Sequence, residues 1–484
     1  MPTEMEAVLG IEVHAQLATR TKAFCACALP TALEEGEENT RVCPTCLGLP
    51  GALPVYNARA LELAVAASLA LGCTVREASV FARKNYFYPD LPKGYQISQL
   101  AEPLAEHGLL HFELDGVRKA VRINRLHLEE DAGKLVHGDT GVSRVDLNRA
   151  GTPLAEIVTE PDLRSAAEAA QYLRELRALL LFVGACDGNL EAGNFRADIN
   201  VSIRPVGSEI LGTRVELKNL NSFRFVERAV KVEVERQKAL LARGDRVVQE
   251  TRGYDETTDS TVPLRSKEEA HDYRYFPDPD LPVLRAPAAL VEAIRAALPP
   301  LPDALRATYT EDLALAPDRV AVLLQHPGLA AFFAACLALG AEPQATANFI
   351  ASDIVRDVEY TGLSARLPLQ PGQLTQLLAM IASGSLSLAQ AKTLYVALRG
   401  TDRAPGELAA ELGLSQLSDE GPIRAAVEEV VAAHASQVAA YRSGKTALLG
   451  FFVGKVMAAT QKRANPEVAN RLLRELLDAP GEPS

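Results

Sequence analysis

The chain has 484 residues, of which 48% are hydrophobic and 23% charged, a composition typical of globular proteins and unlike that of disordered or fibrous chains. This length exceeds what one hydrophobic core supports, so we expect roughly two to four domains. The net charge of −12 argues against indiscriminate nucleic-acid binding but allows a local basic surface. Because the N-terminus lacks a signal-peptide pattern and the apolar runs are too short to cross a membrane, we expect a cytoplasmic protein with no membrane partner.

The predicted elements divide the chain into a part that mixes strands with helices and a part that contains helices only. Helical periodicity in the first part covers residues 57–71, 165–184 and 226–243. After residue 282 the alternating β-branched segments disappear, and closely spaced prolines mark a connector. Short helices are then predicted at residues 288–298, 303–314, 317–326, 329–339, 343–359, 371–383, 387–399, 404–413, 420–441, 445–461 and 465–478. We therefore predict an α+β fold, with an N-terminal domain at 1–292, a helical domain at 293–405 and a helical tail at 406–484.

Four of the seven cysteines form two close pairs, Cys25-x-Cys27 and Cys43-Pro-Thr-Cys46. In a cytoplasmic protein, two such pairs are typical of tetrahedral zinc ligands rather than disulfides. Four thiolates leave no open coordination position, so this zinc would be structural and would staple an insertion at residues 25–46. Four buried thiols without a metal remain the alternative.

Three predicted strands alternate polar with apolar residues, which places their polar side chains on one face. The polar side chains that share such a face are Glu12 and His14; Asp198, Asn200 and Ser202; and Glu216 and Lys218. Carboxylates gathered on one face repel one another unless a cation neutralises them, and hard divalent cations prefer oxygen ligands. A half-solvated antiparallel sheet would explain one such strand, but several strands that combine acids, His and Lys indicate a metal site.

A further polar segment, Glu129-Glu130-Asp131, belongs to the same predicted surface. If Glu129 lies in a strand, His127 shares its face and Glu130 points away. We therefore favour Glu129 as a metal ligand and keep Glu130 as the alternative.

The C-terminal tail is locally basic although the whole chain is acidic. Between residues 442 and 474 only one acid, Glu467, accompanies seven basic residues, namely Arg442, Lys445, Lys455, Lys462, Arg463, Arg471 and Arg474. A solvated helix face can have this composition, but so large an excess favours a partner that carries phosphate. Gly444-Lys445-Thr446 is not a phosphate-binding loop, because residue 439 is Ala and no predicted strand precedes it.

Several long motifs are characteristic when they occur together. They are KNYFYPDLPKGYQISQ at 84–99, HLEEDAGK at 127–134, DLNRAGTPLAEIVTEPD at 146–162, VELKNLNSF at 215–223 and DYRYFPDPD at 272–280. With them the chain resembles the B subunit of the bacterial aspartyl/glutamyl-tRNA amidotransferase. Residues 444–470 are similar to the YqeY-like module of that subunit, which we expect at about 333–484. The cysteine pairs resemble those of the zinc-bearing members of this family.

The resemblance implies a fold and a reaction. The N-terminal domain is expected to be a catalytic cradle similar to glutamine synthetase, in which an antiparallel sheet holds ATP and Mg²⁺. The family phosphorylates the side-chain carboxylate of Asp or Glu mischarged on tRNA(Asn) or tRNA(Gln), and ammonia then displaces the phosphate. The implied partners are the A subunit, which is a glutaminase, and the C subunit, in a heterotrimer, together with the mischarged tRNA.

Roles for individual residues follow from the resemblance together with the polar face. The expected magnesium ligands are Glu12, His14, Glu129, Asp198 and Glu216. The expected catalytic cations, which would meet phosphate oxygens or the substrate carboxylate, are Lys218, Arg149 and Arg196. The expected nucleotide contacts are Lys218, Asn200, Ser202 and Asn219. The expected tRNA contacts are Lys445, Lys455, Lys462 and Arg463.

Two other functions are compatible with parts of the pattern. A tRNA-binding scaffold that has lost its kinase would tolerate degraded carboxylates, yet all the predicted ones are present. A free-standing ammonia ligase for small acids would not need the basic tail. The sequence leaves open whether the substrate is Asp-tRNA(Asn), Glu-tRNA(Gln) or both, and how many metal ions bind.

Overall fold

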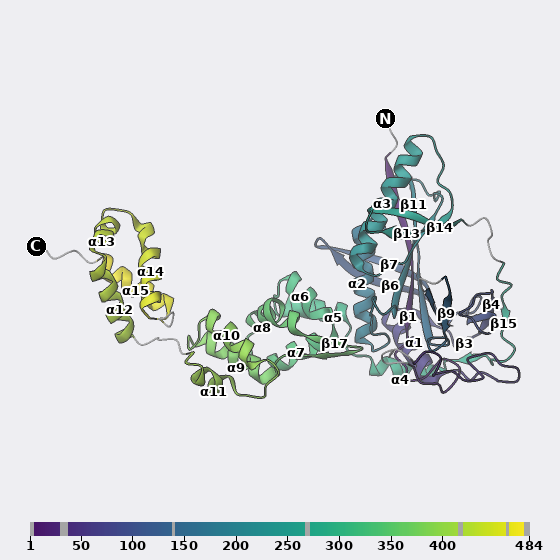
Figure 1. Cartoon of the computed structure of the whole chain (residues 1–484), viewed down its shortest axis with the longest axis horizontal. Helices are drawn as coiled ribbons and strands as arrows, with labels where there is room; N and C mark the ends of the chain where they lie inside the picture. The colour runs from purple at the N-terminus through teal and green to yellow at the C-terminus, as the bar shows by residue number, and fades with distance from the viewer. Residues whose placement is uncertain are drawn as a thin grey trace, which may run out of the picture. The chain divides into compact units, whose positions relative to one another are not determined.

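The computed structural model describes residues 4–29, 37–137, 141–266, 272–414, 420–460 and 464–478 (Figure 1). The chain forms two compact units. The first comprises Met1–Thr308, Leu324–Pro327 and Gly362–Ser364. The second comprises Tyr309–Leu323, Gly328–Thr361 and Ala365–Ser484. The α+β class predicted from the sequence is confirmed, since the first unit contains a large sheet and the second is mainly helical.

A nine-stranded sheet, in the order β14-β13-β12-β11-β1-β10-β7-β6-β2, dominates the first unit. Its strands are β1 (Met5–Gln16), β2 (Thr74–Val75), β6 (Ala105–Leu114), β7 (Val117–Glu130), β10 (Pro153–Thr159), β11 (Phe195–Pro205), β12 (Val215–Lys218), β13 (Glu250–Asp255) and β14 (Ser260–Ser266). Neighbouring strands are antiparallel, as predicted, except for the parallel pair β12–β13. This exception has a physical reason, because helix α3 (Phe223–Ala242) provides the crossover connection that a parallel pair requires.

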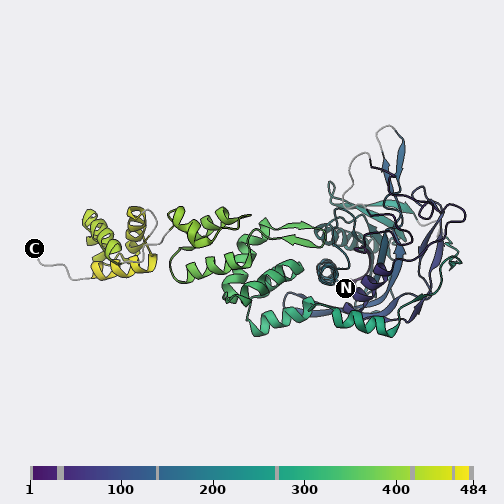
Figure 2. The same cartoon turned by 90° about the horizontal axis from the view of Figure 1, so that it is seen from below.

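The two faces of this sheet differ in polarity. On β1, Ile11 and Val13 are buried while Glu12 and His14 point to the opposite face. Helices α1 (Ala58–Ala70), α2 (Ala166–Phe182) and α3 share one hydrophobic core with the apolar face (Figure 2). The polar face is therefore the one that remains available for a functional site.

The three helices that pack on the large sheet begin at capping residues. Asn57, Ser165 and Ser222 each accept hydrogen bonds from backbone N–H groups in the first turn of α1, α2 and α3. The sequence predicted that α3 begins at residue 226, but it begins at Phe223. The reason is local, since the Ser222 side chain caps the helix by accepting from the backbone N–H of Phe225 at 3.1 Å.

Smaller sheets complete the first unit and bring distant segments beside the large one. One has the order β15-β4-β5, and the others pair β16 with β3 and β8 with β9. Their strands are β3 (Ala78–Ser79), β4 (Ala82–Asn85), β5 (Tyr95–Ser98), β8 (Lys134–His137), β9 (Ser143–Asp146), β15 (Phe276–Pro277) and β16 (Leu284–Arg285). The pairing of β15 with β4 places residues 272–278 next to residues 82–88, which matters for the cavity described below.

Most of the helices predicted after residue 287 are confirmed, with shifts at their ends. They are α4 (Ala288–Ala297), α5 (Pro302–Ala307), α6 (Pro317–Leu324), α7 (Pro327–Ala338), α8 (Pro343–Phe349), α9 (Pro371–Ala382), α10 (Leu388–Leu398), α11 (Pro405–Glu411), α12 (Glu420–Ala433), α13 (Ala435–Arg442), α14 (Leu449–Ala459) and α15 (Pro466–Asp478). The π-helical turns η1 (Thr308–Asp312) and η2 (Ile350–Ile354) and the 3₁₀ turns η3 (Val355–Asp357) and η4 (Thr446–Leu448) extend some of them.

Two predicted helices are interrupted. The helix predicted at residues 343–359 is divided into α8, η2 and η3, which end at Asp357. The short strands β17 (Glu359–Thr361) and β18 (Ser364–Arg366) follow, which the sequence did not indicate. Residues 420–441 are split into α12 and α13 at His434, whose backbone is not helical (φ −128°, ψ 46°). Helices α12, α14 and α15 share their own hydrophobic core, built around Val427, Phe452 and Leu473.

Among the described residues, no single helix is long and apolar enough to cross a membrane. Helices α6 and α7 reach the required length only together, and they are bent by 115° relative to each other.

Glu233 on α3 anchors this helix to β13 and β14 through a buried polar network. Its carboxylate is 0% exposed, accepts two bonds of 2.8 Å from Arg236, and accepts one bond each from Gln237 and Thr261, also at 2.8 Å. Arg252 lies 3.7 Å away. Because so many donors converge on one carboxylate, its removal leaves two guanidinium groups to share one remaining carboxylate, Glu250, and leaves the buried Gln237 and Thr261 side chains without this acceptor.

We predict that Glu233→Leu lowers the free energy of unfolding by about 3–5 kcal/mol, the usual cost of breaking a buried ion pair. Urea denaturation followed by circular dichroism measures this. Glu235→Leu is the matched control, since it removes an exposed carboxylate from the same helix and should change the stability little. Equal effects of the two substitutions would contradict the assignment.

Candidate active site

A cavity of about 1120 Å³ lies over the polar face of the large sheet. Five adjacent strands, β12, β11, β1, β10 and β7, contribute polar side chains to it. These side chains are Glu216 and Lys218 from β12; Arg196, Asp198 and Asn200 from β11; Glu12 and His14 from β1; Glu156 from β10; and His127 and Glu129 from β7. Strand register brings them together, because Glu12 pairs with Asp198, Asn200 with Glu216, and Glu156 with both His14 and His127.

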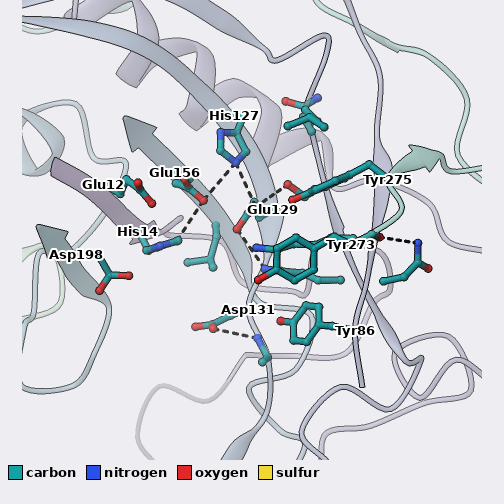
Figure 3. A pocket seen from close by; sticks show the side chains of 18 of the residues that line it. Glu12, His14, Tyr86, His127, Glu129, Asp131, Glu156, Asp198, Tyr273 and Tyr275 are labelled. Carbon is teal, nitrogen blue, oxygen red and sulfur yellow. Dashed lines mark hydrogen bonds and ion pairs between the residues drawn. The ribbon is translucent and has the colours of Figure 1, made fainter. Parts of the chain in front are cut away.

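One group in this cavity has the geometry of a metal site. Ligand atoms of His14, Glu129 and Glu156 all lie within 4.8 Å of one another. His127 bridges the two carboxylates, with Nε2 at 3.2 Å from Glu129 Oε1 and 3.3 Å from Glu156 Oε2 (Figure 3). Glu129 also accepts a hydrogen bond of 2.6 Å from the Ser98 hydroxyl. This group combines buried oxygen donors with a nitrogen donor, a set that suits a divalent cation.

The charges in this group depend on one another. Burial alone would lower the pKa of His127, but the carboxylates of Glu156 and Glu129 outweigh it and raise the pKa to about 9. Burial opposes ionisation of Glu156 as well, yet His127, His14 and Lys84 lower its pKa. His127 therefore supplies positive charge that keeps both carboxylates ionised when no metal ion is present.

A second group lies on the other side of Glu12. The Lys218 ammonium forms ion pairs with Asp198 and, at 3.2 Å, with Glu216. Burial would lower the pKa of Lys218, but these two carboxylates raise it. Glu12 accepts a bond of 3.0 Å from Asn200, and burial, followed by repulsion from Glu156, Asp198 and Glu216, raises its pKa. Glu12 therefore lies close enough to the carboxylates of both groups to be repelled by them.

Glu129 lines the cavity and Glu130 does not. Glu130 points to the opposite side of β7, where it pairs with Lys93 and accepts the backbone N–H of Ile97 at 2.9 Å. The alternation of β7 thus separates the two candidates that the sequence left open.

Arg196 enters the cavity in an orientation that Asp131 fixes. Its two terminal nitrogens donate to the two carboxylate oxygens of Asp131 at 3.0 and 3.1 Å. Burial opposes ionisation of Asp131, but Arg196 and Arg149 outweigh it and lower its pKa. A guanidinium held in this way still has N–H groups for a bound anion.

Three of the residues expected at the site do not line this cavity. Arg149 donates instead to the backbone carbonyls of Ala132 at 3.0 Å and Gly133 at 2.6 Å. Ser202 is buried and donates to the Val8 carbonyl at 3.4 Å. Asn219 follows the end of β12 with a positive φ of 61° and is exposed.

The sequence did not single out several residues that do line it. Glu156 had a usable signal, since it is a charged residue inside the apolar strand PLAEIVT, and a buried charge needs a partner. Tyr86, Tyr273 and Tyr275 form a wall across from the carboxylates (Figure 3). Lys84 lies against this wall, 5.1 Å from the ring centroid of Tyr273. All three tyrosines belong to motifs that carry the family resemblance, but the sequence did not indicate that these motifs meet in the fold.

The four cysteines predicted as ligands form a cluster that can hold a metal ion. The sulfur atoms of Cys25, Cys27, Cys43 and Cys46 lie within 4.8 Å of one another. A hydrogen bond from Cys25 and the nearby Lys22 ammonium lower the pKa of Cys46 to about 4, although burial opposes this. A thiolate is the form that binds metal, so Cys46 is prepared for that role.

Two of the basic residues of the tail already have partners within it. Arg442 donates to the carbonyls of Leu477 at 3.0 Å and Leu476 at 3.2 Å, near the C-terminal end of α15. Arg471 pairs with Glu420 and Glu475. Lys445 and Lys455 are exposed, whereas the predicted tRNA contacts Lys462 and Arg463 lie outside the described residues.

We predict that the metal-free protein loses stability as the pH rises from 6.5 to about 9. His127 has a higher pKa in the folded state than in the unfolded state, so its contribution is complete below 6.5 and lost as the pH passes about 9. His127→Asn should flatten this slope in urea denaturation series. His107→Asn, at an exposed histidine of β6, is the control and should leave the slope unchanged. An unchanged slope in the His127 variant would refute the assignment.

Comparison with known proteins finds one family that matches nearly the whole chain. Residues 7–292 match the family model described as the GatB/GatE catalytic domain, and residues 331–477 match the model described as the GatB domain. The B subunit of the aspartyl/glutamyl-tRNA(Asn/Gln) amidotransferase of Solidesulfovibrio magneticus is 49% identical over 98% of this chain and 99% of its own length. The same subunit of Persephonella marina is 48% identical over 98% and 100%, and that of an Anaeromyxobacter species is 50% identical over 98% and 99%. The chain therefore belongs to the family of aspartyl/glutamyl-tRNA(Asn/Gln) amidotransferase B subunits.

Proposed function

We propose that this chain catalyses the ATP-dependent amidation of Asp on tRNA(Asn), of Glu on tRNA(Gln), or of both. The observation that carries the proposal is the convergence of His14, Glu129 and Glu156 within 4.8 Å in a cavity that also holds Lys218 and Arg196. A scaffold without kinase activity would have no use for this arrangement. The cavity also exceeds the roughly 300–1,000 Å³ of a pocket for one small ligand, which leaves room for a nucleotide and the aminoacyl end of a tRNA.

The reaction needs an activated carboxylate. An oxygen of the Asp or Glu side chain attacks the γ-phosphorus of ATP, the bond to the β,γ-bridging oxygen breaks, and ADP leaves. Ammonia then attacks the carbonyl carbon of the acyl phosphate, loses a proton, and expels inorganic phosphate to give the amide. Catalysis of the first step is mainly positioning and charge neutralisation.

The donor atoms fit magnesium, which prefers oxygen ligands. His14, Glu129 and Glu156 would hold one ion, and Glu12, Asp198 and Glu216 would hold a second or share the first. Bound there, the metal would neutralise phosphate charge and orient the transferred group.

Two cations of the chain complete the site. Lys218 stays protonated between Asp198 and Glu216, and it can present its charge to phosphate oxygens. Arg196, oriented by Asp131, can bind either a phosphate or the substrate carboxylate through its remaining N–H groups.

Other assignments complete the proposal. Ammonia would come from the glutaminase, which is the A subunit, and the C subunit would be a further partner in a cytoplasmic complex. Residues 1–292 would be the catalytic cradle, 293–405 a helical domain and 406–484 the tRNA-binding tail. The metal at the four cysteines would be zinc, because tetrahedral thiolate sites favour it.

The direct test is amidation by the assembled complex, with ammonium chloride in place of glutamine so that the glutaminase step is bypassed. Asp-tRNA(Asn) and Glu-tRNA(Gln) should be amidated only when ATP and Mg²⁺ are present, and free aspartate should not react. Amidation of free aspartate at a similar rate would indicate a small-molecule ligase instead.

We predict that Glu156→Gln reduces this activity by at least the roughly 10–100-fold that even indirect partners of metal ligands contribute. Binding of Mn²⁺ to the ATP-free protein, measured by calorimetry, should weaken as well. Glu160→Gln is the control, since this carboxylate lies one residue beyond β10 and accepts from Asn124 at 2.6 Å outside the cavity. If the Glu156 variant bound Mn²⁺ as tightly as the wild type, Glu156 would not be a metal ligand.

We predict that charge reversal at Lys445 and Lys455 raises the KM for charged tRNA and leaves ATP hydrolysis intact. Reversal at Lys462 and Arg463, or removal of residues 406–484, should do the same. In a plot of the logarithm of the tRNA binding constant against the logarithm of the salt concentration, the slope should become shallower by roughly 0.7–0.9 for each ion pair with a phosphate that a variant removes. Lys231→Glu, at an exposed lysine of α3, is the control. Full activity of the truncated protein on charged tRNA would disprove a role for the tail.

A further inference from the structure

The cysteine cluster does more than close a loop. We infer that, once it binds its metal, it positions the Asp131–Arg196 pair of the active site through residues 146–152, and that Lys22 is the positioning residue at their junction. The inference rests on the proposed function only where it invokes catalysis. The physical link between the cluster and residues 146–152 stands on contacts alone.

Lys22 forms the first contact between the two regions. Its side chain is buried, and its ammonium lies 3.6 Å from Cys46 Sγ and donates to the Leu147 carbonyl at 3.1 Å. The stem of Lys22 packs against Gly151, where an added Cβ would lie 3.5 Å from its Cδ. Gly151 also accepts the backbone N–H of Ala23 at 2.7 Å. A buried ammonium beside metal-bound thiolates offsets their negative charge, so its position should depend on the metal.

The insertion that carries the cysteines forms a second set of hydrogen bonds, to residues 145–148. The Asn39 side chain accepts the backbone N–H of Leu147 at 2.8 Å and donates to the Val145 carbonyl at 2.9 Å. The backbone N–H of Arg41, two residues before Cys43, donates to the Asn148 side chain at 2.8 Å. Asn148 is fully buried, so this bond is shielded from water.

Residues 149–152 in turn fix Asp131. The Gly151 N–H donates to the Asp131 carbonyl at 2.9 Å, and the Asp131 N–H donates to the Thr152 carbonyl at 2.8 Å. Arg149, bound to the carbonyls of Ala132 and Gly133, lies 3.8 Å from the Asp131 carboxylate. Asp131 then holds Arg196 by two hydrogen bonds. This explains why Arg149 is absent from the cavity, since it supports the residue that orients Arg196.

The contacts therefore form one continuous route from the thiolates to a cation of the active site. Every step is a hydrogen bond, an ion pair or a packing contact, and apart from those of the exposed Asn39 the groups are mostly buried or half-buried. A shift of residues 146–152 would turn Arg196, and small errors in the position of a catalytic group cost large factors in rate. Loss of the metal should therefore impair the folded enzyme as well as destabilise it.

The test uses the assembled complex and three variants. Lys22→Met removes the ammonium but keeps the stem, and Lys22→Arg keeps a cation. Asn39→Gly removes the two side-chain bonds of Asn39 but leaves the Arg41–Asn148 bond, and it does not strain the positive φ of 61° at that position. Lys119→Met is the matched control, because it deletes a lysine that pairs with Glu168 away from both regions. Zinc content, hydrogen exchange of residues 146–152 by mass spectrometry, and KM and kcat for ammonia-dependent amidation are measured at a temperature where all variants are folded.

We expect about one zinc per chain in the wild type, as a closed thiolate site requires. Lys22→Met and zinc-stripped wild type should both show about tenfold faster exchange in residues 146–152 and about tenfold lower kcat/KM, a typical cost for an outer partner of a metal site. Lys22→Arg should keep exchange in residues 146–152 and kcat/KM close to their wild-type values. Asn39→Gly should change both in the same direction as Lys22→Met but by less, and Lys119→Met should match the wild type.

Unchanged exchange and kcat/KM in Lys22→Met and in the zinc-stripped protein would overturn the inference. If Lys22→Met did not fold, normal values in Asn39→Gly and in the zinc-stripped protein would overturn it equally. If exchange rose as expected while no form of the complex, wild type included, amidated charged tRNA, the proposed function would be wrong and the link would stand.

Discussion

The pairing of β1, β10 and β7 forces Glu156 between His14 and His127, with the Glu129 carboxylate beside it. Two acids buried so close together would each cost several kcal/mol if they were left without counter-charge. The imidazolium of His127 provides part of that charge in the metal-free molecule, and a bound divalent cation would provide more. The need of these buried acids for counter-charge is thus also the property that would let this face of the sheet bind a divalent cation.

The same pairing explains why the site is built from strands. Side chains alternate along each strand, so a slip of one residue would move Glu12 and His14 into the hydrophobic core and Ile11 and Val13 into the cavity. The core beneath, shared with α1, α2 and α3, therefore fixes the register far more firmly than the polar groups could. Rigid positioning of the acids follows from burial of apolar residues on the opposite face.

Much of this arrangement could be predicted from the sequence, because alternation is a local signal. Glu12 with His14, Asp198 with Asn200, and Glu216 with Lys218 could each be assigned to one face from spacing alone. Glu156 was overlooked because β10 is buried on both faces and does not alternate. That Arg149 does not line the cavity has another reason, since its partners are backbone carbonyls whose position depends on the fold.

Contacts between residues far apart in the chain could not be predicted in this way. Asp131 and Arg196 are 65 residues apart, and nothing in either segment indicates that they pair. The parallel pair β12–β13 could not be foreseen either, because it depends on how α3 packs. The helices were predicted well since capping and periodicity are local, whereas the break at His434 depends on a single backbone conformation.

The central place of β1 has a consequence for synthesis on the ribosome. This strand contains residues 5–16, yet its neighbours are β10 at 153–159 and β11 at 195–205. At about 5–20 residues per second, the nascent chain carries this half-apolar strand with at least one unpaired edge for roughly 10–40 seconds before both partners emerge. Such edges are templates for aggregation, so translation of this protein should be a period of marked dependence on chaperones.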